Sequence, residues 1–372
     1  MKKLLILSTS AGAGHMRAAE ALVTAARTAY PHIEVLSHDS LDYMGGFFQK
    51  VYNRAYLASV SHTPELWGYF YSFSDTKTPK VVSKMMKIFD RLNSKKLTAL
   101  VESYEPDHII CTHFLPTNVL LSARDRKKPK CPISVVLTDY DAHFFWVNKD
   151  VKCYYVASEE TKWDLHKKGV ALEKIKVTGI PIQPVFLERR DRGEVTRELD
   201  IYPDMRTVLV LSGGFGVGDM TKTVDTLMNI PGDFQMLVVA GKNEELRKKL
   251  EKTKKRAGKQ IKVFGYVNNI QDLMDASDIV VTKSGGLTVS ECLTKGLAMV
   301  IFAPIPGQEE RNCDYLLERG AALKAKNLDN LEYKLREVLN NRERQRNLRA
   351  AAFACSKPDA AFRIIDDVVG AR

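Results

Sequence analysis

Short runs of apolar, largely β-branched residues alternate along this chain with longer segments of helical periodicity. These runs are too short for buried helices, and their uniformly apolar character is typical of strands covered on both faces of a parallel sheet. Strands that alternate with helices predict βαβ units, so we expect an α/β protein. The predicted strands are 4–8, 33–37, 108–112, 133–137, 153–157 and 176–178 in the first half, and 207–212, 235–240, 261–264, 279–282 and 299–302 in the second.

The two series of strands predict two doubly wound, Rossmann-like domains. The segment Thr178–Phe186 carries two prolines in a short extended run and is the best candidate for a linker. We therefore expect a first domain over residues 1–180 and a second over 181–350. The amphipathic pattern of Asp359–Val369 predicts a helix within the C-terminal segment 351–372. A chain of 372 residues is long enough to bury two cores.

Composition narrows the class of protein. Apolar residues make up 45% of the chain and charged residues 27%, which is ordinary for a globular protein. The N-terminal apolar run, Leu4–Leu7, is shorter than the roughly 7 residues that a signal-peptide core needs, so we expect a cytoplasmic protein. The six cysteines are scattered without a Cys-x-x-Cys pair, which argues against a disulfide framework or a zinc site.

The positive charge is uneven. Of the formal net charge of +11, a surplus of 7 falls in residues 1–187, where 25 basic residues face 18 acidic ones. Such a surplus favours an anionic partner, either nucleic acid or an anionic membrane surface. The chain contains no recognisable nucleic-acid-binding motif, so we expect the membrane surface and no nucleic acid.

An aromatic and basic segment strengthens that expectation. Residues 43–73 are rich in aromatic side chains, and a second basic cluster occupies 124–130. Between them lies a helical pattern whose basic stripe would suit an interfacial helix, although a helix packed on its own core can show the same pattern. The stripe consists of Lys80, Lys84, Lys87 and Arg91.

The densest group of candidate binding residues follows the predicted strand 279–282. Gly285 and Gly286 turn the chain into a helix expected to begin near Leu287, which aims backbone N–H groups at an anion such as a phosphate. Glu291 lies one turn into that helix, where its carboxylate can accept hydrogen bonds from two sugar hydroxyls. The pattern predicts a nucleotide-sugar pocket; the alternative is an ordinary strand–loop–helix with polar surface residues.

A second glycine-rich loop, Ser212–Asp219, follows the first strand of the second half. Four glycines within six residues let the backbone approach an anion closely. The loop lacks a Gly-Lys-Ser/Thr ending, which excludes a nucleoside triphosphatase loop.

The N-terminal loop carries the best candidate for a catalytic base. Gly12 and Gly14 precede a predicted helix over Met16–Arg27, but Arg17 stands where a dinucleotide-binding loop needs a third glycine. We favour instead a glycine-lined acceptor pocket with His15 at the helix start. An imidazole can accept the proton that an attacking hydroxyl loses, and the positive helix end favours its neutral form. The alternative is that the histidine only caps the helix.

Asp139 is the second candidate, because it closely follows the predicted strand 133–137 at the same sheet edge. Its carboxylate can orient His15, bind the acceptor or act as the base itself. Asp141 and His143 lie close enough in sequence to make the assignment ambiguous, and an acid at a strand end often only caps a helix.

Several motifs together resemble those of the inverting lipid glycosyltransferases. Lys283-Ser-Gly-Gly with Glu291, and Pro306-Gly-Gln-Glu with Asn312, are similar to the donor site of the monogalactosyldiacylglycerol synthases and the bacterial processive diacylglycerol glucosyltransferases. The peptidoglycan-precursor N-acetylglucosaminyltransferase is a more distant relative. The resemblance runs from Ser8 to about Gly320. It implies a glycosyltransferase B-type fold, with two Rossmann-like domains facing across a cleft and a final helix that crosses back to the first domain.

The resemblance also implies a role for each candidate residue. His15 would be the base and Asp139 its assistant, with the acceptor near Gly12 and Gly14. Because the chain lacks a suitable Asp-x-Asp motif, we expect neither a metal nor another cofactor, and the UDP-sugar is a substrate. The donor-binding residues would be Phe264, Gly265, Tyr266 and Val267 at the uracil, Glu291 at the ribose, Gly214, Gly216, Lys283, Ser284, Gly285 and Gly286 around the diphosphate, and Gln308 and Glu309 at the hexose.

The function that this resemblance predicts is transfer of glucose or galactose from a UDP-hexose to the hydroxyl of diacylglycerol, with inversion. The enzyme would work peripherally on the cytoplasmic face of the membrane. One alternative keeps the fold and transfers N-acetylglucosamine to a polyprenyl-diphosphate wall precursor. Another is a UDP-sugar-binding membrane regulator without catalytic activity.

Overall fold

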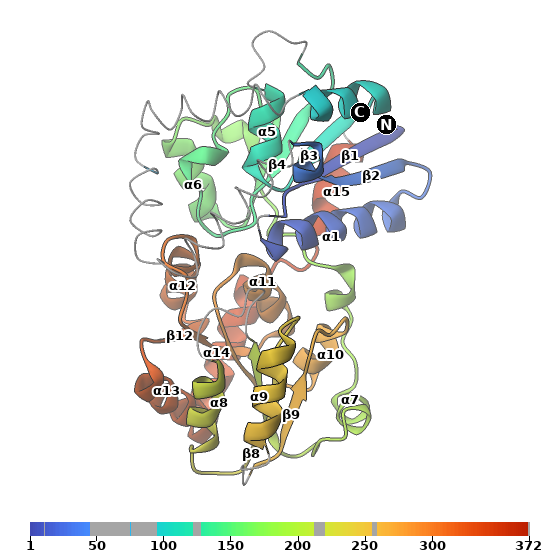
Figure 1. The fold of residues 1–372 in the computed structure, drawn as a ribbon. Coiled ribbons are helices and arrows are strands. Elements are labelled where there is room, and N and C mark those ends of the chain that lie inside the picture. The colour runs from blue at the N-terminus through green and yellow to red at the C-terminus, as the bar shows by residue number, and fades with distance from the viewer. Residues whose placement is uncertain are drawn as a thin grey trace. The chain divides into compact units, whose positions relative to one another are not determined.

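The computed structural model describes residues 1–10, 12–44, 75, 95–121, 128–211, 220–254 and 259–370, drawn as ribbon in Figure 1. The chain divides into two compact units. The first comprises residues 1–184, 306–308 and 357–372, and the second comprises 185–305 and 309–356. Three predicted features lie outside the described residues: the glycines of the loop 213–218, the aromatic and basic segment up to residue 91, and the basic residues 124–127.

The first unit is built on a six-stranded parallel sheet with the order β2-β1-β3-β4-β5-β6. The strand order reverses between β1 and β3, and in open α/β sheets ligands bind at the carboxyl ends of the strands at such a switch point. The strands are β1 (Lys3–Ser8), β2 (Glu34–Asp39), β3 (His108–Cys111), β4 (Ile133–Val136), β5 (Cys153–Val156) and β6 (Ile175–Val177).

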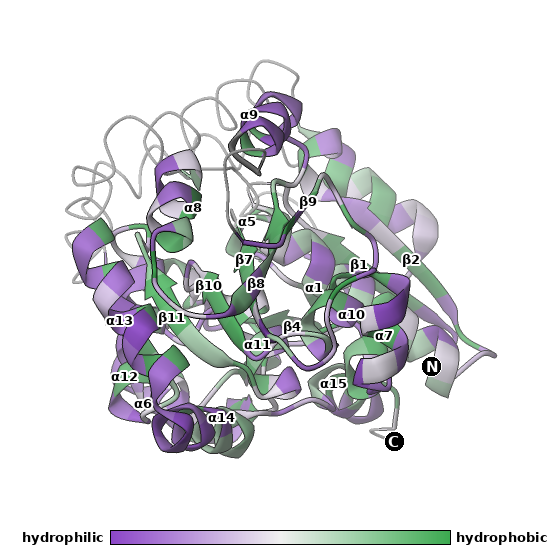
Figure 2. Ribbon diagram, turned by 90° about the horizontal axis from the view of Figure 1, so that it is seen from below, coloured by the Kyte–Doolittle hydropathy of each residue, from purple (hydrophilic) through white to green (hydrophobic). Residues whose placement is uncertain are grey.

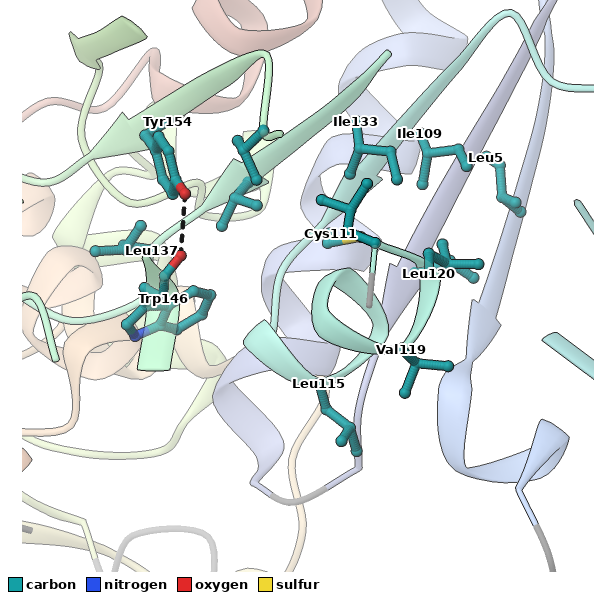
Figure 3. Packing of buried hydrophobic residues seen from close by; sticks show 14 of the residues in the cluster. Leu5, Ile109, Cys111, Leu115, Val119, Leu120, Ile133, Leu137, Trp146 and Tyr154 are labelled. Carbon is teal, nitrogen blue, oxygen red and sulfur yellow. Dashed lines mark hydrogen bonds between the residues drawn. The ribbon is translucent and has the colours of Figure 1, made fainter. Parts of the chain in front are cut away.

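Alternate residues of β1 serve two cores, one on each face of this sheet. Leu4 and Ile6 pack with residues of α1 (Ala13–Ala29) and α15 (Ala360–Gly370), whereas Leu5 and Leu7 pack into the core on the other face. Figure 3 shows that second core, where the Tyr154 hydroxyl donates a hydrogen bond of 3.1 Å to the carbonyl of Trp146. The other helical segments of this unit are η1 (Ser40–Tyr43), residues 95–104, α5 (Phe114–Leu121), η2 (Phe144–Trp146), α6 (Glu159–Lys167), η3 (Leu172–Lys174) and η4 (Pro184–Leu187), the last continuing into the second unit.

Helix α15 belongs to the first unit although the chain reaches it from the second. Its apolar face, which includes Ile364 and Ile365, is buried in the same core as α1. The Tyr155 hydroxyl donates to Asp367 at 2.7 Å, and Lys176 forms an ion pair with the same carboxylate. Apolar burial and a shared carboxylate therefore hold the C-terminal helix on the first sheet.

The second unit contains another six-stranded parallel sheet, with the order β12-β11-β10-β7-β8-β9. Counted from β7, this is the order 3-2-1-4-5-6 of a Rossmann fold, whose switch point lies between β7 and β10. The strands are β7 (Arg206–Leu211), β8 (Phe234–Val239), β9 (Ile261–Phe264), β10 (Ile279–Thr282), β11 (Ala298–Phe302) and β12 (Ala322–Ala325).

The helices of the second unit show the amphipathic patterns that cover such a sheet. In α13, Leu331, Leu335 and Val338 are buried at spacings of four and three residues, which places them on one face. Figure 2 shows green strands in this unit beside helices that carry purple, hydrophilic residues. The helices are α7 (Arg192–Glu198), α8 (Met220–Met228), α9 (Glu244–Lys254), α10 (Ile270–Asp275), α11 (Gly286–Lys295), α12 (Gln308–Glu318), α13 (Leu328–Asn340) and α14 (Arg342–Cys355).

The predicted α/β class and the eleven predicted strands are confirmed, and β12 was missed. Its sequence, Ala322-Leu-Lys-Ala, is short and carries a lysine in the middle, so it lacks the apolar run that revealed the other strands. All six cysteines carry free thiols, in agreement with the prediction. Among the described helices, none combines the length and the apolar character that crossing a bilayer requires.

Candidate active site

His15 lies in the first turn of α1, at the switch point of the first sheet. The helix begins at Ala13, three residues before the predicted start. Gly12 immediately precedes it with φ at 154°, a backbone conformation that residues with a side chain rarely adopt. Gly14 therefore belongs to the helix, and only Gly12 shapes the loop in front of it. The early start brings His15 against the end of β3.

Two threonines hold the His15 ring. Its Nδ1 lies 2.9 Å from the carbonyl oxygen of Thr112 and 2.8 Å from Oγ1 of Thr138. A carbonyl oxygen can only accept a hydrogen bond, so Nδ1 carries the proton and Nε2 keeps its lone pair. The Thr112 hydroxyl also donates to the His15 carbonyl at 3.0 Å. Backbone and ring are thus both tied to the end of β3, in the tautomer that leaves Nε2 able to take a proton.

The electrostatic environment keeps this imidazole neutral. Burial lowers the pKa of His15 to about 4, against the smaller opposing effect of the hydrogen bond to Thr112. We predicted a neutral histidine from the positive helix end, and the structure adds burial as the principal cause. A neutral ring with a defined tautomer is the form in which a histidine acts as a base.

The aromatic neighbours of His15 come from two other elements. The ring of His113 meets it edge to face at a centroid distance of 4.6 Å, and the Trp146 ring lies at 6.3 Å. Thr112, Thr138 and His113 were not among the residues predicted for the site. Their one available signal was position, because each follows or ends a predicted strand at the carboxyl edge that holds Asp139.

Asp139 directly follows Thr138 and is half-buried. The partners that the structure gives to Nδ1 of His15 are Thr112 and Thr138, so orientation of the ring rests on these two residues. His143 uses its own Nδ1 to accept a hydrogen bond of 3.1 Å from the backbone N–H of Phe145, at the start of η2. This local cap gives His143 a structural role, and the role of Asp139 toward the acceptor stays a prediction.

In the second unit, the predicted diphosphate loop follows β10 at the switch point. Helix α11 starts at Gly286, with Gly285 as its N-cap residue, close to the predicted start. Ser284 donates through Oγ to the carbonyl of Glu309 at 2.6 Å, and Asn312 donates through Nδ2 to the carbonyl of Ser284 at 2.9 Å. The start of α12 therefore holds this loop in place.

Charged residues surround the same loop. Burial lowers the pKa of Lys283, while the nearby Glu309 carboxylate acts in the opposite direction. The Glu309 carboxylate accepts a hydrogen bond of 2.7 Å from the Ile305 N–H through Oε2. Glu291 is buried in α11, with 4% of its surface exposed. Gln308 and Glu309 are the first two residues of helix α12.

The predicted uracil-binding residues lie at the end of β9. The Phe264 carbonyl accepts a hydrogen bond of 2.9 Å from Ala240 and closes the ladder to the end of β8. Gly265 and Val267 are half-buried, and Tyr266 is exposed with the Lys242 ammonium 5.3 Å from its ring centroid. Three inter-strand spacings, about 14 Å, separate β10 from β9, so an elongated ligand is needed to reach both. The remaining two predicted donor residues, Gly214 and Gly216, lie outside the described residues.

Two doubly wound units, each with candidate ligand residues at its switch point, have the architecture of the glycosyltransferase B-type fold. Among solved structures, Acinetobacter baumannii MurG is similar with a TM-score of 0.64 at 15% identity, over the full length of both chains. Anabaena HepE in complex with UDP-glucose is similar with a TM-score of 0.60 at 14% identity, again over both full chains. These likenesses concern the fold.

Sequence comparison identifies the family. The monogalactosyldiacylglycerol synthase model matches residues 15–182, and the model for glycosyl transferases of group 1 matches 225–354. The processive diacylglycerol beta-glucosyltransferase of Bacillus subtilis (strain 168) is 32% identical over 326 residues, which cover 87% of this chain and 83% of the relative. The enzyme of the same name from Bacillus pumilus (strain SAFR-032) is 27% identical and covers 99% and 94% of the two chains. The chain belongs to the glycosyltransferase family of the monogalactosyldiacylglycerol synthases and the processive diacylglycerol glucosyltransferases.

Proposed function

We propose that this glycosyltransferase moves a hexose from a UDP-hexose to the primary hydroxyl of diacylglycerol, with inversion at the anomeric carbon. The observation that carries the proposal is the hydrogen bond from Nδ1 of His15 to the Thr112 carbonyl, which leaves Nε2 as a proton acceptor at the switch point of the first sheet. The names of the curated relatives support diacylglycerol as the acceptor and glucose as the first donor to test.

The transfer is a single displacement. The acceptor oxygen forms a bond to the anomeric carbon, its proton passes to Nε2 of His15, and the bond from the anomeric carbon to the diphosphate breaks. UDP leaves with the electron pair of that bond. The negative charge of the donor raises the pKa of a nearby imidazole, so the base strength of His15 increases when the donor is bound.

The second unit supplies the donor site in this proposal. The N–H groups at the start of α11 and the Lys283 ammonium stabilise the negative charge that develops on the leaving diphosphate. Burial lowers the pKa of Lys283, and the negative charge of a bound diphosphate stabilises the charged form of this lysine. Glu291 binds the ribose hydroxyls, and Gln308 and Glu309 bind the hexose.

The acceptor is a membrane lipid, so the enzyme has to work at a membrane surface. The surplus of basic residues in the first half of the chain supports docking on the anionic, cytoplasmic face. Vesicles with and without an anionic lipid test this part of the proposal directly, because docking through charge has to weaken on neutral vesicles and at high salt.

The deciding experiment measures transfer of radiolabelled hexose from UDP-glucose and UDP-galactose to vesicles that contain diacylglycerol. The wild type is compared with His15→Ala and with His32→Ala, a matched change of an exposed histidine. We expect a glycolipid from the wild type and His32→Ala, and none from His15→Ala. Binding of UDP without a product from either sugar would overturn the proposal that diacylglycerol is the acceptor. The next assay then uses UDP-N-acetylglucosamine and a polyprenyl-diphosphate acceptor. A product indicates a wall-precursor enzyme, and no product indicates a regulator.

A further inference from the structure

A second buried histidine contacts the candidate base. His113 follows Thr112 at the end of β3, and 3% of its surface is exposed. Its ring meets the ring of His15 at a centroid distance of 4.6 Å and an interplanar angle of 89°. The rings of Phe114 and Trp146 lie 4.2 and 6.2 Å from His113, so the imidazole is held in an aromatic environment.

The hydrogen bonds assign opposite tautomers to the two histidines. The backbone N–H of Leu115 donates to Nδ1 of His113 at 3.1 Å, so this nitrogen carries the lone pair and Nε2 carries the proton. In His15 the proton is on Nδ1 instead. Burial lowers the pKa of His113 well below its usual value, and a charge on His15 lowers it further. Two neutral rings are therefore in contact, one protonated on Nδ1 (His15) and the other on Nε2 (His113).

We propose that His113 is a positioning residue for hexose transfer, which acts by packing its ring against His15 and so fixes the orientation and the hydration of the base. The inference rests on the proposed role of His15. Thr112 holds Nδ1 at one edge of the His15 ring, and His113 covers a further part of that ring. Together they leave the imidazole little freedom to rotate or to take up water.

A structural role alone does not explain the ring of His113. Acceptance of the Leu115 N–H needs one acceptor atom two residues earlier, which an asparagine side chain also provides. The edge-to-face contact with His15 needs an aromatic ring at position 113. The two roles can therefore be separated by substitution, since His113→Asn keeps the acceptor and loses the ring, while His113→Phe keeps a ring and loses the acceptor.

Other ionisable residues lie on the elements that carry or flank His15 and His113. Arg17 lies on α1, Asp39 ends β2, Asp139 and Asp141 follow β4, and His143 precedes η2. These groups are unchanged in both variants, so a difference between His113→Asn and His113→Phe comes from the ring and the acceptor at position 113.

The test follows the pKa of His15 by NMR and the pH profile of kcat/KM for hexose transfer. In His113→Asn we expect the pKa of His15 to rise toward 6.5, because its ring gains hydration. The acid limb of the pH profile should then move to higher pH. We expect kcat to fall about 10- to 100-fold, with the KM for the UDP-hexose unchanged. In His113→Phe we expect the wild-type acid limb with a lower melting temperature. His32→Asn is the control at an exposed site.

Two results would overturn the inference. One is a His15 pKa and a kcat in His113→Asn that equal those of the wild type. The other is an equal loss of kcat in both variants without any shift of the acid limb, which would make His113 purely structural. The NMR titration needs no turnover, so it tests the coupling even where diacylglycerol fails as the acceptor, and failure of the proposed function is then seen separately.

Discussion

The Nδ1 atom of His15 lies 2.9 Å from the carbonyl oxygen of Thr112, a residue 97 positions further along the chain. The contact joins the first turn of α1, the helix after β1, to the residue that follows β3, and the order of the first sheet reverses between these two strands. Because the acceptor is a backbone atom, the tautomer of His15 depends on how the sheet is paired. The pairing of strands therefore sets the tautomer of the proposed base, and the Thr138 side chain gives its ring a further hydrogen-bond partner.

Thr138→Val tests the side-chain part of that preparation. The substitution keeps the shape of the residue and removes the hydroxyl 2.8 Å from Nδ1 of His15. A hydrogen bond contributes about 0.5–1.5 kcal/mol, so we expect kcat to fall by up to about tenfold while the KM for the donor is unchanged. Thr24→Val, at an exposed position of α1, serves as the control. An unchanged kcat would show that Thr112 alone orients the ring.

Asn312→Ala tests the support of the donor loop. Asn312 is fully buried and donates to the Ser284 carbonyl, next to the glycines that start α11. Loss of a buried hydrogen bond costs about 1–3 kcal/mol, part of which we expect as a 5- to 30-fold weaker binding of UDP in calorimetry. The acid limb of the pH profile should not move, because the contacts of Thr112 and Thr138 with His15 are unchanged. Unaltered UDP binding, with exposed Asn340→Ala as reference, would remove the loop from the donor site.

Lys295→Met tests the buried ion pair of the second unit. The Lys295 ammonium lies 2.8 Å from Asp275 and 2.5 Å from the Glu188 carbonyl, and the two side chains are 1% and 8% exposed. Removal of the cation leaves a buried carboxylate uncompensated, which costs about 3–5 kcal/mol, so the urea midpoint should fall strongly. Arg336→Ala, which breaks an exposed pair with Glu332, should cost under about 1 kcal/mol. Similar effects of the two substitutions would contradict this account.

Stability should fall in mild acid because of His108. Burial lowers its pKa to about 4, while the unfolded chain titrates near 6.5. Between these values the unfolded state binds more protons than the folded state, so the free energy of unfolding rises with pH and is lost as the pH falls toward 4. The contribution is about 3 kcal/mol, from roughly 2.5 pKa units at 1.36 kcal/mol each.

Urea unfolding at pH 7, 5.5 and 4.5 measures this dependence. His108→Leu should flatten it, although a slope remains because burial also lowers the pKa of His15 and His113. The exposed His32→Leu should keep the wild-type slope. A wild-type slope in His108→Leu would show that His108 is not a source of the acid sensitivity.

Prediction from the sequence succeeded where the pattern is local. The strand 279–282 and the helix after Gly285 were found because an apolar run and two glycines lie within ten residues of one another. Prediction failed for β12, where Lys324 interrupts the apolar run. Pairing with β11 outweighs this weak local preference.

The α/β class, the series of eleven strands and the candidate catalytic and binding residues follow from the sequence, since hydrophobic period and side-chain type are properties of the chain. Which of these groups meet depends on the tertiary structure. Thr112 and Thr138 are ordinary threonines in the sequence and become partners of His15 because β1, β3 and β4 are neighbours in one parallel sheet. Contacts across about 100 residues depend on strand pairing, and the burial that lowers the His15 pKa depends on the finished core.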